Sequence, residues 1–137
     1  MDTSKESAGI GDMKVRLSTL WILVMFNMLA ADILGFMMPE FLDVLKTGQA
    51  GGIQITPGFL LVAAIMLEIP IAMIALSRVL TYRANRLANI IAGVITIAFV
   101  IGGGSTKPHY LFLASVEVVI MSLIIWYAWK WPESPVE

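Results

Sequence analysis

Residues 58–77 read GFLLVAAIMLEIPIAMIALS, and Glu68 is the only charged residue among them. A helix of about 20 apolar residues is long enough to cross the hydrocarbon core of a bilayer, so this stretch predicts a transmembrane helix. Three other stretches have a similar length and composition, and they are residues 17–38, 87–103 and 110–129. The sequence therefore predicts an all-α membrane protein, a bundle of four transmembrane helices.

The composition agrees with this fold class and excludes several others. The chain is 58% hydrophobic and 14% charged with a mean hydropathy of +0.85, whereas soluble domains carry roughly 25% charged residues. The absence of Cys excludes disulfides and thiolate metal sites. The net charge of −1 and the dispersed basic residues give no reason to expect a nucleic-acid partner.

The parts of the chain outside the spans are short. Residues 1–16 are polar and are expected to form a flexible tail before a membrane domain at 17–131, and residues 132–137 form a second tail. Segment 39–48 begins with Pro, has acids early and Lys late, and ends at Gly, which predicts a short helix at the outer membrane surface. The turn-rich residues 51–57 are expected to cover the outer mouth of the bundle.

Lys and Arg are unequally divided between the two ends of the predicted bundle. Cytoplasmic loops are enriched in these residues, so the richer end, which carries both termini, is expected to be cytoplasmic. All four Trp residues lie at that same end, where Trp is common at the level of the lipid headgroups. The richer end has Lys5, Lys14, Arg16, Arg78, Arg83, Arg86 and Lys130, and the other end has Lys46 and Lys107.

Four stretches of this chain together resemble a family of small prokaryotic four-span membrane proteins of unknown function. They are KVRLSTLWILVMFNMLAADILGF, GFLLVAAIMLEIPIAMIALSRVL, YRANRLANIIAGVITIAFVIGGG and IIWYAWKWP. The resemblance extends from Lys14 to Pro132, and in size and layout the chain is loosely similar to DoxX-like membrane proteins. The resemblance to the four-span family implies four spans in a prokaryotic plasma membrane. It does not imply an activity or a site residue.

Three carboxyl groups lie inside the predicted spans, and no Lys or Arg lies at their depth: Asp32, Glu68 and Glu117. An ionisable group in hydrocarbon costs roughly several kcal/mol, so each is by default a candidate functional residue. Acids of this kind can exchange protons or hold a cation. The alternative is that each is protonated and hydrogen-bonded to a neighbour, such as Asn27, Tyr110 or Thr96.

Glu68 is the main candidate, because it lies near the middle of its span and Pro70 follows two positions later. Ala64, Glu68, Ala72 and Ala75 recur at helical spacing, and small residues mark faces where membrane helices approach closely. This stripe predicts that Glu68 faces the interior of the bundle.

The fourth span has a comparable stripe, which contains Tyr110, Ala114, Glu117 and Met121. It predicts that Glu117 also faces the bundle, with Tyr110 one or two turns further out.

The remaining polar candidates have weaker patterns. Asn27 and Asp32 are five positions apart, about 140° around a helix, so only one of them can point at the bundle axis, and the sequence leaves open which. Asn89 is expected to form a hydrogen bond between helices in preference to binding a ligand. His109 follows a Pro at the outer rim and is a further binding or proton-exchange candidate.

These candidates leave three functions open. The first is a proton-coupled carrier of small cations or amines that uses the intramembrane carboxyl groups. The second is a membrane-embedded enzyme acting on a lipid or isoprenoid, with Glu68 and Glu117 as acid and base. The third is an assembly subunit whose acids fix helix pairing.

We expect no metal site, because no Glu-x-x-His pair occurs, and no cofactor. The expected partners are the lipid bilayer, a small cationic or lipid-like ligand, and a second copy of the chain.

Overall fold

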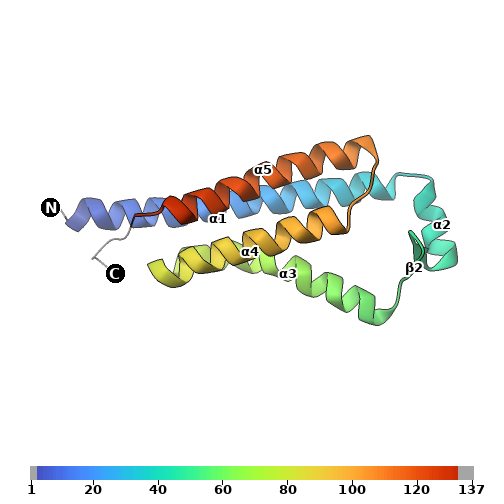
Figure 1. The fold of residues 1–137 in the computed structure, drawn as a ribbon, viewed down its shortest axis with the longest axis horizontal. Helices are drawn as coiled ribbons and strands as arrows, with labels where there is room; N and C mark the ends of the chain where they lie inside the picture. The colour runs from blue at the N-terminus through green and yellow to red at the C-terminus, as the bar shows by residue number, and fades with distance from the viewer. Residues whose placement is uncertain (1–2, 133–137) are drawn as a thin grey trace.

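The structure is a computed structural model and describes residues 3–132. Four long helices run along the molecule, with a short helix and a small hairpin between the first two (Figure 1). Each long helix has the length and apolarity needed to cross a membrane, so the predicted four-helix fold class is confirmed. The elements are α1 Thr3–Phe36, α2 Glu40–Thr47, β1 Gln49–Ala50, β2 Ile53–Gln54, α3 Pro57–Val79, α4 Tyr82–Gly102 and α5 Pro108–Lys130.

Two helices begin well before the apolar stretches that predicted them. The segment 1–16, expected as a flexible tail, is helical from Thr3 onward, and α4 begins at Tyr82, before the predicted residue 87. A helix satisfies its own backbone hydrogen bonds and can extend beyond the membrane with polar side chains in water. The apolar stretches therefore indicate which residues can cross a membrane, but they do not indicate where each helix begins.

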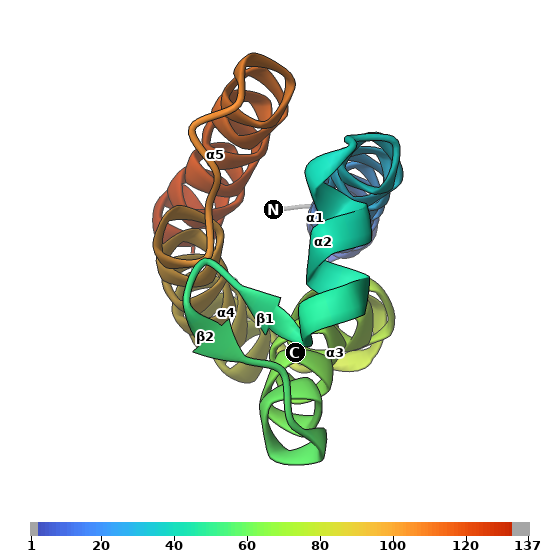
Figure 2. The same ribbon diagram turned by 90° about the vertical axis from the view of Figure 1, so that its right-hand side faces the viewer.

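The four long helices form a ring in which each packs antiparallel against two neighbours. Helix α1 contacts α3 and α5, and α4 contacts the same two helices from the other side (Figure 2). We call the end where α1 begins and α5 finishes the terminal end, and the opposite end, with α2 and the β1–β2 hairpin, the hairpin end (Figure 1). Toward the hairpin end, α3 diverges from α4 (Figure 1).

The apolar core fills the centre of the bundle. Trp21, Val24, Met121 and Ile124 have no exposed surface. Helices α4 and α5 approach especially closely at Gly93, where an added Cβ would lie 2.7 Å from Cγ1 of Ile125. The absence of a side chain at this glycine permits that approach.

A buried hydrogen-bond network joins three of the helices in the terminal half. Asn89 Oδ1 accepts from Trp21 Nε1 at 2.8 Å and from Ser77 Oγ at 3.3 Å. Asn85 Nδ2 in turn donates to the carbonyl of Ser77 at 2.7 Å. The prediction that Asn89 forms a hydrogen bond between helices is confirmed.

The predicted rotation of α3 is wrong. Glu68 and the small residues of its stripe, at 64, 72 and 75, are exposed on the outer face of the bundle. Pro70, Met73 and Ser77 are the buried residues of α3. Helix α3 is apolar on all sides, with a hydropathy of 2.6 over its span, so large side chains as well as small ones were available to face the core.

The short helix predicted within residues 39–48 is present as α2. Pro39 precedes α2, and Gly48 ends it in the left-handed conformation, with φ of 68°. Lys107, in the α4–α5 loop, donates to Glu40 at the start of α2, with 2.8 Å between Nζ and Oε1. This ion pair connects the two loops across the hairpin end.

Candidate binding cavity

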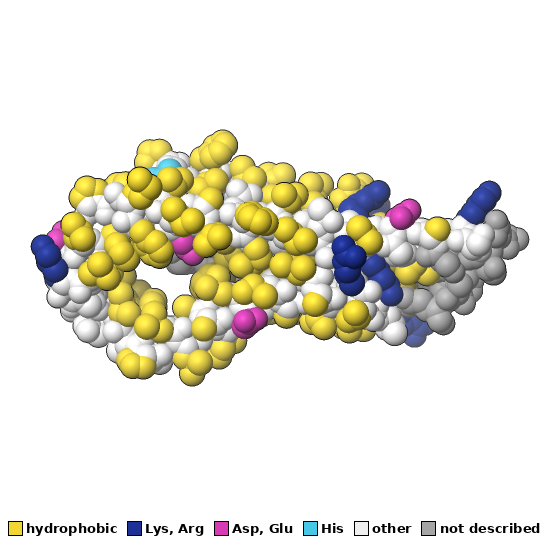
Figure 3. Space-filling model, turned by 180° about the vertical axis from the view of Figure 1, so that it is seen from behind, with side chains coloured by type: hydrophobic (Ala, Val, Ile, Leu, Met, Phe, Trp, Pro, Cys, Tyr) yellow, Lys and Arg dark blue, Asp and Glu magenta, His cyan; other side chains and the backbone are white. Residues whose placement is uncertain are grey.

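A cavity of about 240 Å³ lies between the four long helices, in the half of the bundle nearer the hairpin end. On the face seen in Figure 3, the molecule is hollowed toward that end. All four long helices contribute to its wall, and two of the three intramembrane acids are among the lining residues. The wall consists of Met28, Ala31, Asp32, Ala63, Leu67, Phe99, Val100, Gly103, Tyr110 and Glu117.

Glu117 is held inside the bundle by the face of α5 on which it lies. That face also carries the buried residues Met121, Ile124 and Ala128 at helical spacing. Glu117 itself is 3% exposed and no hydrogen bond of its carboxyl group is found within residues 3–132; its oxygens are not among the fully buried atoms without a partner, so they border the cavity. The prediction that Glu117 faces the interior is confirmed, and the hydrogen-bond partners expected for a purely structural acid are not observed.

Asp32 reaches the same cavity from α1. It follows the buried Ala31 and is more exposed than Glu117. The two acids, on α1 and α5, border the same cavity. Asn27 is half-buried and does not line the cavity, whereas Asp32 lines the cavity although its side chain is exposed, so of Asn27 and Asp32 it is Asp32 that faces this space.

The cavity wall that holds the two acids also contains the hydroxyl group of Tyr110. The Tyr110 hydroxyl donates to the carbonyl of Val100 at 2.7 Å, which fixes its ring in the cavity wall. Thr96 lies one helical turn before Val100 on α4 and is 1% exposed. Its Oγ1 has no hydrogen-bond partner in the part of the chain described. Thr96 shares one face of α4 with Asn89 and Gly93, as the sequence pattern indicates, and all three residues are buried.

The other two candidates lie elsewhere. Glu68 is exposed on the outer face of α3 and is not among the lining residues. His109 is half-buried in the first turn of α5 and does not line the cavity. Within residues 3–132 there is no group of three or more His, Cys, Asp or Glu side chains that could hold a metal ion.

The chemistry of the wall is acidic and apolar. No Lys, Arg or His is present among the lining residues, so nothing in the wall neutralises the two carboxyl groups. Most of the remaining surface comes from side chains such as Met28, Leu67 and Phe99. At ~30 Å³ per water molecule the volume corresponds to roughly eight waters, which suits a small ligand with a positive charge and some apolar surface.

The fold and the cavity together define a small integral membrane protein with four spanning helices and an internal acidic site. The chain belongs to a family described as a family of unknown function, DUF6326, whose model matches residues 9–136. The resemblance to four-span proteins of unknown function is confirmed at this level. No curated protein and no solved structure matches the chain.

Proposed function

We propose that this protein is a proton-coupled carrier of small cations or amines, and that Glu117 and Asp32 form its binding site. The observation that carries the proposal is a carboxyl group, Glu117, that is 3% exposed, has no hydrogen bond within the described residues, and lines a cavity with a second acid. A carboxyl group that borders a cavity and has no partner on the protein is satisfied there by a ligand, an ion or water.

Exchange of a proton for a cation follows from the absence of a basic residue in the wall. Two neighbouring carboxyl groups in a cavity of low dielectric are stabilised by a bound positive charge, either a proton or a cation. A cation that enters therefore releases a proton, and a proton that binds releases the cation. The apolar side chains around the acids contact the uncharged part of an amine.

The orientation that supports this function has both termini in the cytoplasm. Most Lys and Arg side chains visible in Figure 3 lie in the terminal half of the molecule, and such residues are enriched on the cytoplasmic side. The cavity then lies in the outer half of the membrane. A reporter that is active only in the cytoplasm, fused to the C terminus, should be active, and activity of an exterior-only reporter at that position would contradict this orientation.

The function is tested by proton release from the purified protein in weakly buffered detergent. Addition of methylammonium or guanidinium to the wild type should release about one proton per bound cation. Glu117→Gln should abolish the release, since Gln resembles the protonated acid in shape and cannot ionise. Asp32→Asn should reduce it.

Asp43→Asn is the matched control, because it removes one carboxyl group from exposed α2, outside the cavity. It should leave the release unchanged. Release that persists in Glu117→Gln would contradict the carrier function. A folded Glu117→Gln with no change in any property would favour an assembly role.

The outward position of Glu68 supports a second part of the proposal, that the carrier is a homo-oligomer. Helix α3 is the least covered helix, since 11% of its span is buried against 28–33% for the other three. A carboxyl group exposed to hydrocarbon is costly, and the neighbouring Ala64 and Ala72 permit another helix to approach closely. A second copy packed against this face would cover Glu68.

The homo-oligomer is tested with Ala72→Leu, which places a larger side chain on the exposed face of α3. The variant should lower the dimer fraction measured by native mass spectrometry. Val119→Leu, at an exposed position on α5, is the control and should not lower that fraction. A wild type that is monomeric in lipid nanodiscs would contradict the homo-oligomer.

A further inference from the structure

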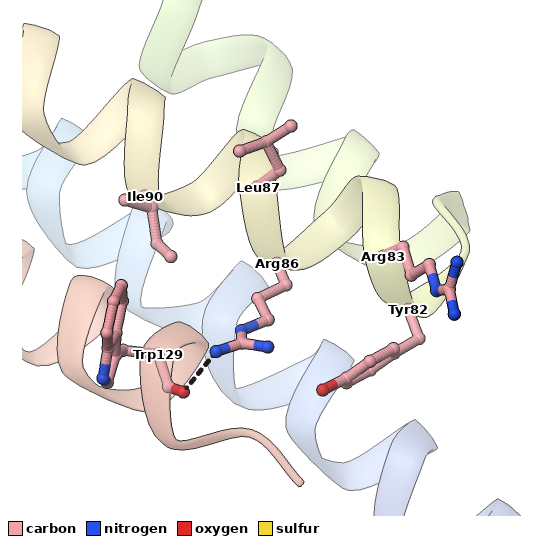
Figure 4. A pocket seen from close by; sticks show the side chains of 6 residues that line it. All are labelled: Tyr82, Arg83, Arg86, Leu87, Ile90 and Trp129. Carbon is pink, nitrogen blue, oxygen red and sulfur yellow. Dashed lines mark hydrogen bonds between the residues drawn. The ribbon is translucent and has the colours of Figure 1, made fainter. Parts of the chain in front are cut away.

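A second cavity, separate from the acidic one, lies between α4 and α5 at the terminal end (Figure 4). Its volume is about 490 Å³, and it shares no lining residue with the acidic cavity. It is lined by Tyr82, Arg83, Arg86, Leu87, Ile90 and Trp129.

The polarity of this cavity changes along its length. Arg83 lies in the first turn of α4, at the terminal end, and Ile90 lies about two turns deeper along the helix. In Figure 4 Arg83 lies at one end of the row of lining residues, Arg86 lies in the middle beside Trp129, and Ile90 and the Trp129 ring lie toward the other end. A ligand that fits this order has a negative group at the membrane surface and an apolar part that extends into the membrane.

Arg86 is positioned by α5. Its Nη2 donates to the carbonyl of Trp129 at 2.9 Å, and its guanidinium carbon lies 5.8 Å from the centroid of the Trp129 ring. A guanidinium group has five N–H donors, so this hydrogen bond leaves others for a phosphate. Among residues 3–132, no Asp or Glu lines this cavity.

The apolar residues of the cavity face the surroundings of the bundle. Leu87 is 60% exposed and Trp129 is 64% exposed. In a membrane, this surface contacts acyl chains. Trp is also common at the level of the headgroups, which is where a phosphate bound to Arg86 would lie.

From these observations we propose that the α4–α5 cavity binds an anionic phospholipid. The lipid phosphate accepts hydrogen bonds from Arg86, and an acyl chain lies along Leu87 and Ile90. A free phosphate ion shares the headgroup chemistry but leaves the apolar half of the cavity unoccupied. Basic pockets between transmembrane helices are suited to anionic headgroups for the same electrostatic reason.

Native mass spectrometry of the full chain tests this proposal. The protein is reconstituted with a mixture of phosphatidylglycerol and phosphatidylcholine that have identical acyl chains, and the retained lipids are counted. The wild type should retain phosphatidylglycerol in preference to phosphatidylcholine. Arg86→Gln should weaken that retention by roughly tenfold, the effect of losing one charge-assisted hydrogen bond.

Arg16→Gln is the matched control, since Arg16 lies at the same end of the molecule, stacks on Tyr127 and does not line the cavity. It removes the same charge and should leave retention unchanged. Leu87→Glu is a second test that does not depend on the Arg86 hydrogen bond, because its exposed position tolerates substitution in the fold. It should expel the anionic lipid, whereas Leu87→Gln should retain it.

Three results would overturn the proposal. Equal retention of the two lipids would show that the cavity does not recognise the negative headgroup. An equal loss in Arg16→Gln and Arg86→Gln would assign the preference to general surface charge. Displacement of phosphatidylglycerol by excess inorganic phosphate would assign the site to a free anion.

Discussion

At the scale of single residues, the position of Glu117 depends on its neighbours on α5. The buried residues at 121, 124 and 128 fix the rotation of the helix, and Glu117 lies on the same face and so enters the interior. Asp32 depends in the same way on the buried Met28 and Ala31 of α1. The acids are therefore placed by apolar packing, and no bond between them is needed.

Asn89 provides a residue-scale prediction. Asn89→Ala removes the acceptor of the Trp21 indole N–H and leaves that buried donor without a partner, so it should destabilise the protein by about 1–3 kcal/mol. Asn27→Ala is the control, because Asn27 is half-buried and has no side-chain hydrogen bond within residues 3–132. Thermal unfolding of both variants in one detergent gives the comparison, and equal shifts in melting temperature would contradict the role assigned to the network.

At the scale of elements, α3 shows where sequence patterns stop being informative. Its small residues indicated a packing face, and the structure places that face outward and buries Met73 and Pro70. In α5 the same kind of pattern was correct for Glu117. The two helices differ in how far they are buried, since 28% of the α5 span is buried against 11% of the α3 span, and α3 diverges from α4 toward the hairpin end (Figure 1).

Met73 and Ala72 give the corresponding prediction for α3. Met73→Ala removes a side chain that is 3% exposed, and it should destabilise the fold by about 2 kcal/mol or more. Ala72→Leu adds methylene groups on the exposed face and should leave the unfolding of the monomer unchanged. Denaturant titration in mixed micelles measures both. A larger loss of stability in Ala72→Leu would restore the rotation predicted from the small-residue stripe.

The fold class, the α2 helix and the interior position of Glu117 were accessible from the sequence because each follows from a local pattern. The meeting of Asp32 with Glu117 was not, since they are 85 positions apart (117 − 32) and only the ring of helices brings them together. The α4–α5 cavity was also not predicted. In the sequence, Arg83 and Arg86 indicate only which end of the bundle is rich in positive charge. That they lie beside Trp129 depends on how α4 and α5 pack.

At the scale of the whole molecule, the Glu40–Lys107 ion pair joins α2 to the α4–α5 loop. The hydrogen bond and the positive charge from Lys107 lower the pKa of Glu40 below its ordinary value of 4.5. Since the folded pKa is below the unfolded one, the pair contributes its stabilisation above the unfolded pKa and loses it as the pH falls through the folded pKa. Lowering the pH should therefore break the ion pair and let α2 move away from the α4–α5 loop.

The chain has no Cys, so this release can be followed with two introduced labels. Spin labels at Leu45→Cys and Ser105→Cys should show a longer and broader distance distribution below the folded pKa than at neutral pH. Glu40→Gln should show the broad distribution at both pH values, and Asp43→Asn should behave like the wild type. A narrow distribution in Glu40→Gln would mean that other contacts hold α2.

The central claim is that the buried Glu117 gives up a proton when a cation enters the cavity. The most direct measurement is an infrared difference spectrum of the protein in lipid, recorded before and after methylammonium is added at constant pH. We predict loss of a protonated carboxyl band and gain of a carboxylate band in the wild type, and neither change in Glu117→Gln. A cation-induced carboxyl signal of the same size in Glu117→Gln, or no signal in the wild type, would contradict the claim.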